Sequence, residues 1–193
     1  MLVNTLRSTY SVATGFGSFV RLLPLRCLGL RTGAGVRVGG GTSWPLGNLR
    51  NLRLDENASV GKRGWFYLAL DNRAARIHIE SGTAVGDEFV ITAADSIHIG
   101  RDCLLSFRVT VMDHSHVAGW GIKPVTSGVT PGKAIEIGER CFIGCNAVIM
   151  PGVKLGANCI VGANSVVTKS FEEGSVIAGA PAKLLRSIKP VTV

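Results

Sequence analysis

A six-residue repeat runs along much of the chain and constrains its fold more than any other feature. An α-helix needs apolar residues at a spacing near 3.6, and an ordinary half-buried strand alternates every two residues. A strict period of six instead fits short strands joined by sharp corners, with each hexad forming one side of a triangular coil and three hexads closing it. In the C-terminal half, the repeating aliphatic positions are Ile137, Ile143, Ile149, Leu155, Val161 and Val167.

The same repeat is present upstream with one change of phase. Its positions there are Ile79, Val85, Ile91 and Ile97, then, after a slip of two residues, Ile99, Leu105 and Val111, while Val60 and Phe66 fit an earlier coil. A second column of small or β-branched residues follows the first at a distance of four: Cys103, Val109, Cys141, Ala147, Val153, Cys159 and Ser165. Two inward columns predict a narrow core between stacked parallel strands.

The composition agrees with a core of aliphatic side chains. Hydrophobic residues make up 46% of the chain, but aromatic residues only 6%. Each buried aliphatic side chain contributes about 1.5–3 kcal/mol, so long columns can stabilise a rod without large rings. The five cysteines include no CxxC pair, which favours a reducing, cytoplasmic compartment over a disulfide framework or a zinc site. No metal site is predicted.

The N-terminal segment, residues 1–54, differs from the rest in charge, with seven arginines and no acidic residue. Such an arm suits an anionic partner, but the chain has no motif that reads nucleic acid, so we expect none to bind. Arg7, Arg21 and Arg26 interrupt the apolar residues, which fits neither a cleaved signal nor a membrane span. Two interpretations stay open: peripheral association with the inner face of the membrane, or a cap over the first coil.

The repeat is interrupted by a long irregular loop, residues 113–134, which begins with the sequence DHSH. Loops that leave a rigid scaffold are where functional residues concentrate. A histidine can accept a proton from an attacking hydroxyl or amine, and a carboxylate can fix its tautomer. We therefore expect His114 or His116 to act as a general base. The orienting carboxylate is Asp113, or Asp95, which we place in the inward column about one coil below.

The chain resembles the hexapeptide-repeat acyltransferases, in particular the sugar O-acetyltransferases that modify polysaccharides and lipopolysaccharide precursors. The resemblance covers about residues 55–188 and is most specific in IEIGERCFIGCNAVIMPGVKLGANCIVGANSVVTKSFEEGSVIAGAPAKLLR, from Ile135 to Arg186. It implies an all-β fold, a left-handed parallel β-helix, which runs against the usual right-handed rule for crossovers. The expected organisation is an arm or cap (1–54), a β-helix catalytic domain (55–180) with its protruding loop (113–134), and a C-terminal tail or short helix (181–193).

The resemblance also implies an activity and partners. Members of the family transfer an acetyl group from acetyl-CoA and form homotrimers with active sites in the clefts between subunits. Their catalytic histidine opens the interrupting loop, which assigns the base to His114, with His116 as the alternative. The pantetheine arm runs along the C-terminal coils, and a small Ala163 would leave room for it while cations suit the phosphates. By position, the implied cofactor-binding residues are Cys145, Ala163, Thr168, Lys169, Lys183 and Arg186.

We predict an acetyl-CoA-dependent O-acetyltransferase that acts on a hydroxyl of a sugar or polysaccharide precursor. His114 removes the proton, transfer is direct, and backbone N–H groups hold the oxyanion. Transfer to an amino sugar or another small amine is the alternative, and covalent catalysis through Cys145 is a lesser one.

Two other classes of function remain to be weighed. A zinc-dependent carbonic anhydrase on the same scaffold would need three converging histidines, but His98, His114 and His116 do not have that spacing. His78 and His98 each precede an inward isoleucine and are expected to face solvent without a role. A non-catalytic polysaccharide-binding or assembly module is the third class, and the intact DHSH and PAKLLR segments argue against it.

Overall fold

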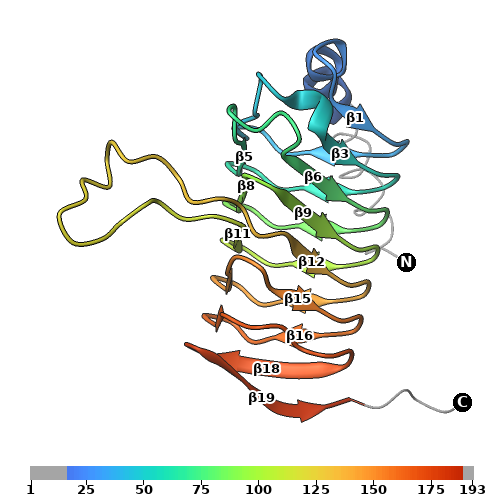
Figure 1. Ribbon diagram of the computed structural model, residues 1–193. Helices are drawn as coiled ribbons and strands as arrows, with labels where there is room; N and C mark the ends of the chain where they lie inside the picture. Colours follow the sequence, from blue (N-terminus) through green and yellow to red (C-terminus); the bar gives the residue numbers. More distant parts are fainter. Residues whose placement is uncertain (1–16, 189–193) are drawn as a thin grey trace, which may run out of the picture.

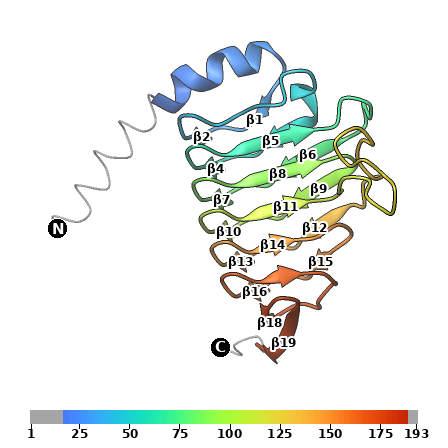
Figure 2. The same cartoon turned by 90° about the vertical axis from the view of Figure 1, so that its left-hand side faces the viewer.

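The computed structural model describes residues 17–188 of the chain. They form a left-handed parallel β-helix, a rod of triangular coils stacked along one axis (Figures 1 and 2). The fold predicted from the repeat is confirmed. Each face of the rod is one sheet, and the chain passes from sheet A to sheet B to sheet C in each coil.

The three sheets are built from short strands that pair across neighbouring coils. Sheet A contains β1 (Arg31–Thr32), β3 (Leu52–Leu54), β6 (Arg76–Ile79), β9 (Ser96–Ile99), β12 (Ile135–Ile137) and β15 (Lys154–Leu155). Sheet B contains β2 (Arg37–Val38), β4 (Ser59–Val60), β7 (Ala84–Val85), β10 (Leu104–Leu105), β13 (Phe142–Ile143), β16 (Ile160–Val161), β18 (Ser175–Gly179) and β19 (Ala182–Ser187). Sheet C contains β5 (Trp65–Leu68), β8 (Val90–Ala93), β11 (Thr110–Met112), β14 (Val148–Ile149) and β17 (Val166–Val167).

Both predicted columns point into the rod. The aliphatic positions after the loop are at most 3% exposed, and the small column from Cys141 to Ser165 is at most 2% exposed. The thiols of Cys141 and Cys159 lie in neighbouring coils, as their spacing predicted, and all five cysteines are free. Ser165 is the polar member of the column, and its hydroxyl accepts a hydrogen bond from the Gly179 backbone N–H. These positions are therefore closed to solvent, and among the described residues no buried side-chain polar atom is left unpaired.

Many of the sharp corners are made by residues in the left-handed region of backbone conformation. Asn146, Asn158 and Asn164 occupy it with φ between 57° and 58°. Asparagine tolerates this region better than most residues because its side chain bonds locally. The Asn146 amide donates to Oδ1 of Asn164 in the next coil over 3.1 Å, so the corners are also linked along the rod.

The outer surfaces of sheets A and C differ sharply. Outward positions on sheet A are charged or polar, and those on sheet C are mostly apolar and half-buried in the single chain. The sheet A residues, in register along the rod, are Arg53, His78, His98, Glu136 and Lys154. The sheet C residues are Tyr67, Val90, Thr92, Thr110, Met112, Val148 and Val166.

The N-terminal end of the rod is covered by a helical segment, residues 17–27 (Figure 2). Leu22 is 2% exposed against the first coil, and the Ser18 hydroxyl accepts from the Val38 N–H over 3.1 Å. The segment expected as an arm thus contains this cap and the first strands of the rod, together with the short 3-10 turn η1 (Leu49–Asn51). Residues 1–16 of the expected arm lie outside the described residues. Within 17–188, no helix has the length and apolar character needed to cross a bilayer.

The C-terminal end differs from the tail or short helix that we expected. Residues Ala182–Ser187 form β19, which pairs antiparallel with β18 and closes the last coil. The backbone N–H and C=O groups of β18 would otherwise be an open sheet edge, and β19 covers them.

Candidate active site

All departures from the period of six lie at one corner of the rod, where the chain passes from sheet C to sheet A. The steps across the other two corners keep the period, as from Ile79 to Val85 and from Val85 to Ile91. At this C/A corner, by contrast, extra residues separate β5 from β6 and β8 from β9, and the whole loop 113–134 separates β11 from β12. The loop projects from the rod at this point (Figure 1). The irregular backbone therefore collects on one edge and leaves the rest of the coils in register.

Asp113 is the first residue after β11 and lies inside this corner. Its side chain is 0% exposed. Its Oδ1 accepts the Ala94 N–H over 2.7 Å, and its Oδ2 accepts the Asp95 N–H over 2.8 Å. A buried carboxylate is costly unless hydrogen bonds satisfy its oxygens. The two-residue slip that the sequence revealed is the source of these donors, because Ala94 and Asp95 are the extra residues between β8 and β9.

The carboxylate of Asp113 in turn fixes the imidazole of His114. Nδ1 of His114 lies 2.8 Å from Oδ1 of Asp113, and the His114 side chain is 10% exposed. Because an ionised carboxylate only accepts hydrogen bonds, Nδ1 must donate, and the lone pair of the neutral ring is then on Nε2. The Tyr67 ring packs beside the imidazole, with centroids 6.0 Å apart. The result is a rigid imidazole whose free nitrogen can accept a proton.

The structure separates the other two candidates from this pair. Asp95 is half-buried rather than inward, and it contributes its backbone N–H to Asp113 while Asp113 alone holds the imidazole. The placement of Asp95 in the inward column was wrong, because the two extra residues at this corner shift its phase. His116 is exposed on the loop and pairs through its backbone with Val129.

The loop is a ribbon with an apolar tip. Its two arms are joined by hydrogen bonds from the Val117 N–H to the Gly128 carbonyl (3.1 Å) and from the Thr130 N–H to the Ser115 carbonyl (2.7 Å). Trp120 at the tip is fully exposed. At the root, the loop packs so tightly that a Cβ on Gly132 would lie 2.4 Å from the Asp95 nitrogen. A cleft of about 350 Å³ opens beside this contact, lined by Asp71, Asn72, Ala94, Asp95, Val129, Thr130, Pro131 and Gly132.

The residues that the family resemblance implied for the cofactor fall into two groups on one chain. Cys145 and Ala163 lie in adjacent coils at the corner between sheets B and C, where the Asn164 N–H donates to the Cys145 carbonyl over 2.9 Å. Thr168 and Lys169 lie at the C/A corner, on the same edge as His114. Lys183 and Arg186 are exposed on β19. Ala163 and His114 are thus on opposite edges of sheet C.

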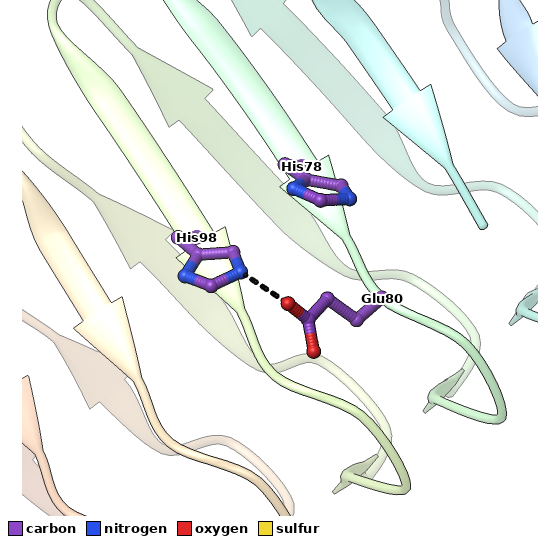
Figure 3. Close-up of side chains that lie close together, drawn as sticks. All are labelled: His78, Glu80 and His98. Carbon is purple, nitrogen blue, oxygen red and sulfur yellow. Dashed lines mark hydrogen bonds and ion pairs between the residues drawn. The ribbon is translucent and has the colours of Figure 1, made fainter.

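Two features were not found from the sequence. Tyr67 beside His114 had no signal, because it stands at an outward position of an early coil. His78 and His98 face outward as expected, but they also stack on each other and meet Glu80 (Figure 3). Their 20-residue separation, one coil, was the available signal. Within the described residues, this group of possible metal ligands contains neither His114 nor His116, so the carbonic anhydrase arrangement of His98, His114 and His116 is not formed.

Comparison with known proteins agrees with the geometry. The family model for the bacterial transferase hexapeptide (six repeats) matches residues 134–169, the coils that follow the loop. Over these residues the chain therefore carries the hexapeptide repeats of this transferase family. WbbJ of Escherichia coli K12, named a lipopolysaccharide biosynthesis O-acetyl transferase, is 36% identical over 117 residues, which are 57% of this chain and 60% of WbbJ. A protein of Dictyostelium discoideum named an acetyltransferase is 48% identical over 94 residues, 48% of this chain and 47% of that protein. The match thus spans less than two thirds of either relative.

Solved structures of several acyltransferases share the rod. A galactoside acetyltransferase in complex with coenzyme A is 25% identical with a TM-score of 0.55, covering 80% of this chain and 66% of that one. An acetyltransferase of Vibrio cholerae complexed with acetyl coenzyme A is 25% identical with a TM-score of 0.56, covering 81% and 72%. AntD, an N-acyltransferase of Bacillus cereus, has a TM-score of 0.70 at 17% identity over 86% of this chain and 88% of AntD, a likeness of fold.

Proposed function

We propose that this chain is an acetyl-CoA-dependent O-acetyltransferase that acts on a hydroxyl of a sugar or polysaccharide precursor. The observation that carries the proposal is the buried Asp113–His114 pair at the root of the loop. The Asp113 carboxylate has no exposed surface, and two backbone N–H groups already hydrogen-bond its oxygens. The fold therefore does not require a histidine beside it. The carboxylate orients an imidazole with its basic nitrogen available, which is the arrangement that general-base catalysis requires.

The proposed reaction is direct transfer. Nε2 of His114 accepts the proton of the acceptor hydroxyl as the oxygen forms a bond to the thioester carbonyl carbon. The tetrahedral oxyanion then collapses, the carbon–sulfur bond breaks, and the imidazolium returns the proton to the leaving thiolate. Asp113 stabilises the transient positive charge and keeps the ring from rotating. Such a base contributes about 10²–10⁴ in rate.

A homotrimer completes the proposed site. His114 and Ala163 lie on opposite edges of sheet C, so one chain cannot place a thioester held along Cys145 and Ala163 next to its own imidazole. The outer face of sheet C is mostly apolar and only half-buried, which suits burial against a partner. Packing through this face would set the Ala163 edge of one chain beside the His114 edge of the next. Thr168 and Lys169 of the second chain, with Lys183 and Arg186 on β19, supply polar groups and cations for the rest of acetyl-CoA.

The class of acceptor is supported by the relatives. The name of WbbJ, a relative that shares 36% of the matched residues, favours a hydroxyl of a lipopolysaccharide precursor. AntD was solved with the nucleotide sugar dTDP-4-amino-4,6-dideoxyglucose, which favours a sugar amine as the alternative acceptor. Both acceptors use the same proton transfer to His114, so the site chemistry is common to them.

A membrane surface is the second proposed partner. The helical segment 17–27 exposes Phe19, Val20 and Leu23, each more than half exposed, beside Arg21 and Arg26. Apolar and cationic side chains on one short helix suit peripheral binding to an anionic leaflet, here the cytoplasmic one. A Phe19→Ser, Leu23→Ser variant that keeps the oligomeric state of the wild type should co-sediment less with anionic liposomes. Equal binding of the variant and the wild type would rule out membrane binding through this helix.

The direct test is release of free thiol from acetyl-CoA across a panel of sugars, nucleotide sugars and short glycans. We expect turnover with a hydroxyl acceptor, and product analysis by mass spectrometry distinguishes an ester from an amide. Val148→Glu on the outer face of sheet C should yield a monomer by light scattering and lose turnover, and Leu104→Glu on the exposed face of sheet B is the matched control. No thiol release with any acceptor, from a trimer that binds CoA, would reject the proposal.

A further inference from the structure

Three metal-ligating side chains meet on the outer face of sheet A, away from the loop. His78 in β6 and His98 in β9 are paired in register, and their rings stack with centroids 5.2 Å apart. Glu80 follows β6 and turns back towards the two rings (Figure 3). One possible ligand atom from each of the three residues lies within 4.8 Å of the others. The proposed transferase reaction uses none of these residues.

The hydrogen bonds already present order this group in the way that metal sites are ordered. Nε2 of His98 lies 3.0 Å from Oε1 of Glu80. Two ligands of a tetrahedral zinc ion, each about 2.0–2.1 Å from the metal, are about 3.3 Å apart. An ion could therefore take the place of the proton shared by Glu80 and His98 with only small side-chain rotations.

Asp55 provides the outer support. Its Oδ2 lies 2.8 Å from Nε2 of His78, and Arg53 holds its Oδ1 over 2.6 Å. Burial opposes its ionisation, but the bonds from His78 and Arg53 outweigh burial and hold the pKa of the Asp55 carboxyl below its usual range. With Nε2 engaged by a carboxylate, Nδ1 of His78 is the nitrogen left to bind a metal. Metal-ligating histidines commonly give their second nitrogen to such a carboxylate.

We propose that His78, Glu80 and His98 form a Zn²⁺ site on sheet A, with Asp55 as a positioning residue. Two imidazoles and one carboxylate suit zinc better than the oxygen-seeking Ca²⁺ or Mg²⁺. The half-exposed setting leaves the fourth position to water. Because β6 and β9 belong to neighbouring coils, the ion would fasten two coils together on the N-terminal side of the loop.

The test is titration of the EDTA-treated, tag-free protein with ZnCl₂ by calorimetry, followed by Co²⁺ substitution. We expect one ion per chain, a visible Co²⁺ spectrum of tetrahedral type and a higher thermal midpoint with Zn²⁺. Glu80→Gln and His98→Ala should each weaken binding at least about tenfold, and Asp55→Asn should weaken it about 10–100-fold. His116→Ala is the matched control, since it removes an exposed histidine elsewhere and should bind as the wild type does.

Two results would overturn the site. One is wild-type protein that takes up no stoichiometric Zn²⁺ or shows no thermal shift. The other is Zn²⁺ binding that survives in both Glu80→Gln and His98→Ala, which would place the ion elsewhere. Circular dichroism of the variants separates loss of binding from loss of fold. None of these measurements depends on acetyl transfer, so failure of the zinc site and failure of the proposed function are distinguishable.

Discussion

The protein contains the same chemical pair, a histidine bonded to a carboxylate, in two settings. At the C/A corner, His114 is 10% exposed and its partner Asp113 is wholly buried. On sheet A, His78 is 30% exposed and its partner Asp55 22% exposed. The bond lengths are equal at 2.8 Å, so distance does not distinguish the two pairs.

The difference lies in what holds the carboxylate. Asp113 is held by two backbone N–H groups, which are part of the coil itself, whereas Asp55 is held by the exposed side chain of Arg53. Rigid dipoles in a dry corner favour a precisely oriented base. Side-chain partners at a wet surface favour a site that can adjust around an ion. Burial and the rigidity of the partner, more than the residue types, separate the proposed base from the proposed ligand.

Removing each histidine gives the largest expected contrast. His114→Ala should lower turnover about 10²–10⁴-fold because the proton acceptor is gone, while His98→Ala leaves turnover unchanged. The measurement is thiol release at saturating acetyl-CoA, with the oligomeric state of each protein compared by light scattering. If His114→Ala were as active as the wild type, or if His116→Ala lost activity instead, the general base would be a residue other than His114.

Asp113→Asn tests the rigid carboxylate. The amide group cannot accept from the imidazole and from both backbone N–H groups, so turnover should fall about 10²–10⁴-fold through the wrong tautomer. Because a buried donor is left unpaired, stability should also fall by about 1–3 kcal/mol in urea unfolding. If Asp113→Asn kept both turnover and stability, the buried pair would have no special role.

Gly132→Ala tests the backbone support without touching the pair. The new Cβ would lie 2.4 Å from the Asp95 nitrogen, so the root of the loop and the Asp95 backbone must move apart, and we expect this to disturb the bond from the Asp95 N–H to Asp113. We expect turnover to fall about tenfold, equal to about 1.4 kcal/mol, with the KM for acetyl-CoA unchanged. Gly128→Ala, with nothing within 4 Å of its Cβ, controls for a general effect on the loop, although its φ of +74° carries some strain. Equal turnover in the wild type and Gly132→Ala would show that the contact between Gly132 and the Asp95 backbone does not contribute to the mechanism.

Asp55→Asn should have the smallest effect, at most about 1 kcal/mol at neutral pH in EDTA, because the pair is partly exposed. The pKa of Asp55 is lowered in the fold, so its contribution is present above the pKa of an unfolded aspartate, about 3.9, and is lost as pH falls through the folded value. Urea unfolding of both proteins across this range should show their difference shrinking as pH falls. A difference that stayed constant would contradict the cause given for the shift.

The rod could be predicted from the sequence because its two inward columns are side-chain patterns, visible at Ile143 and Ala147 as a spacing. The loop and the DHSH segment were visible for the same reason. The donors at Ala94 and Asp95 were not, because a backbone N–H has no sequence signature, and the slip that creates them also misplaced Asp95. The C-terminal strand was missed because Ala182–Ser187 lacks alternation, with one buried residue followed by exposed ones.

Confining every insertion to one corner has a consequence for how such proteins diversify. Residues added at the C/A corner leave the pairing of the coils above and below unchanged, as β11 and β14 pair in register on either side of the loop. The C/A corner is therefore a place where segments of different length can be inserted without changing the strand pairing of the rod. The length of the loop and the pairing of the coils can then change independently, since they are encoded in separate stretches of the chain.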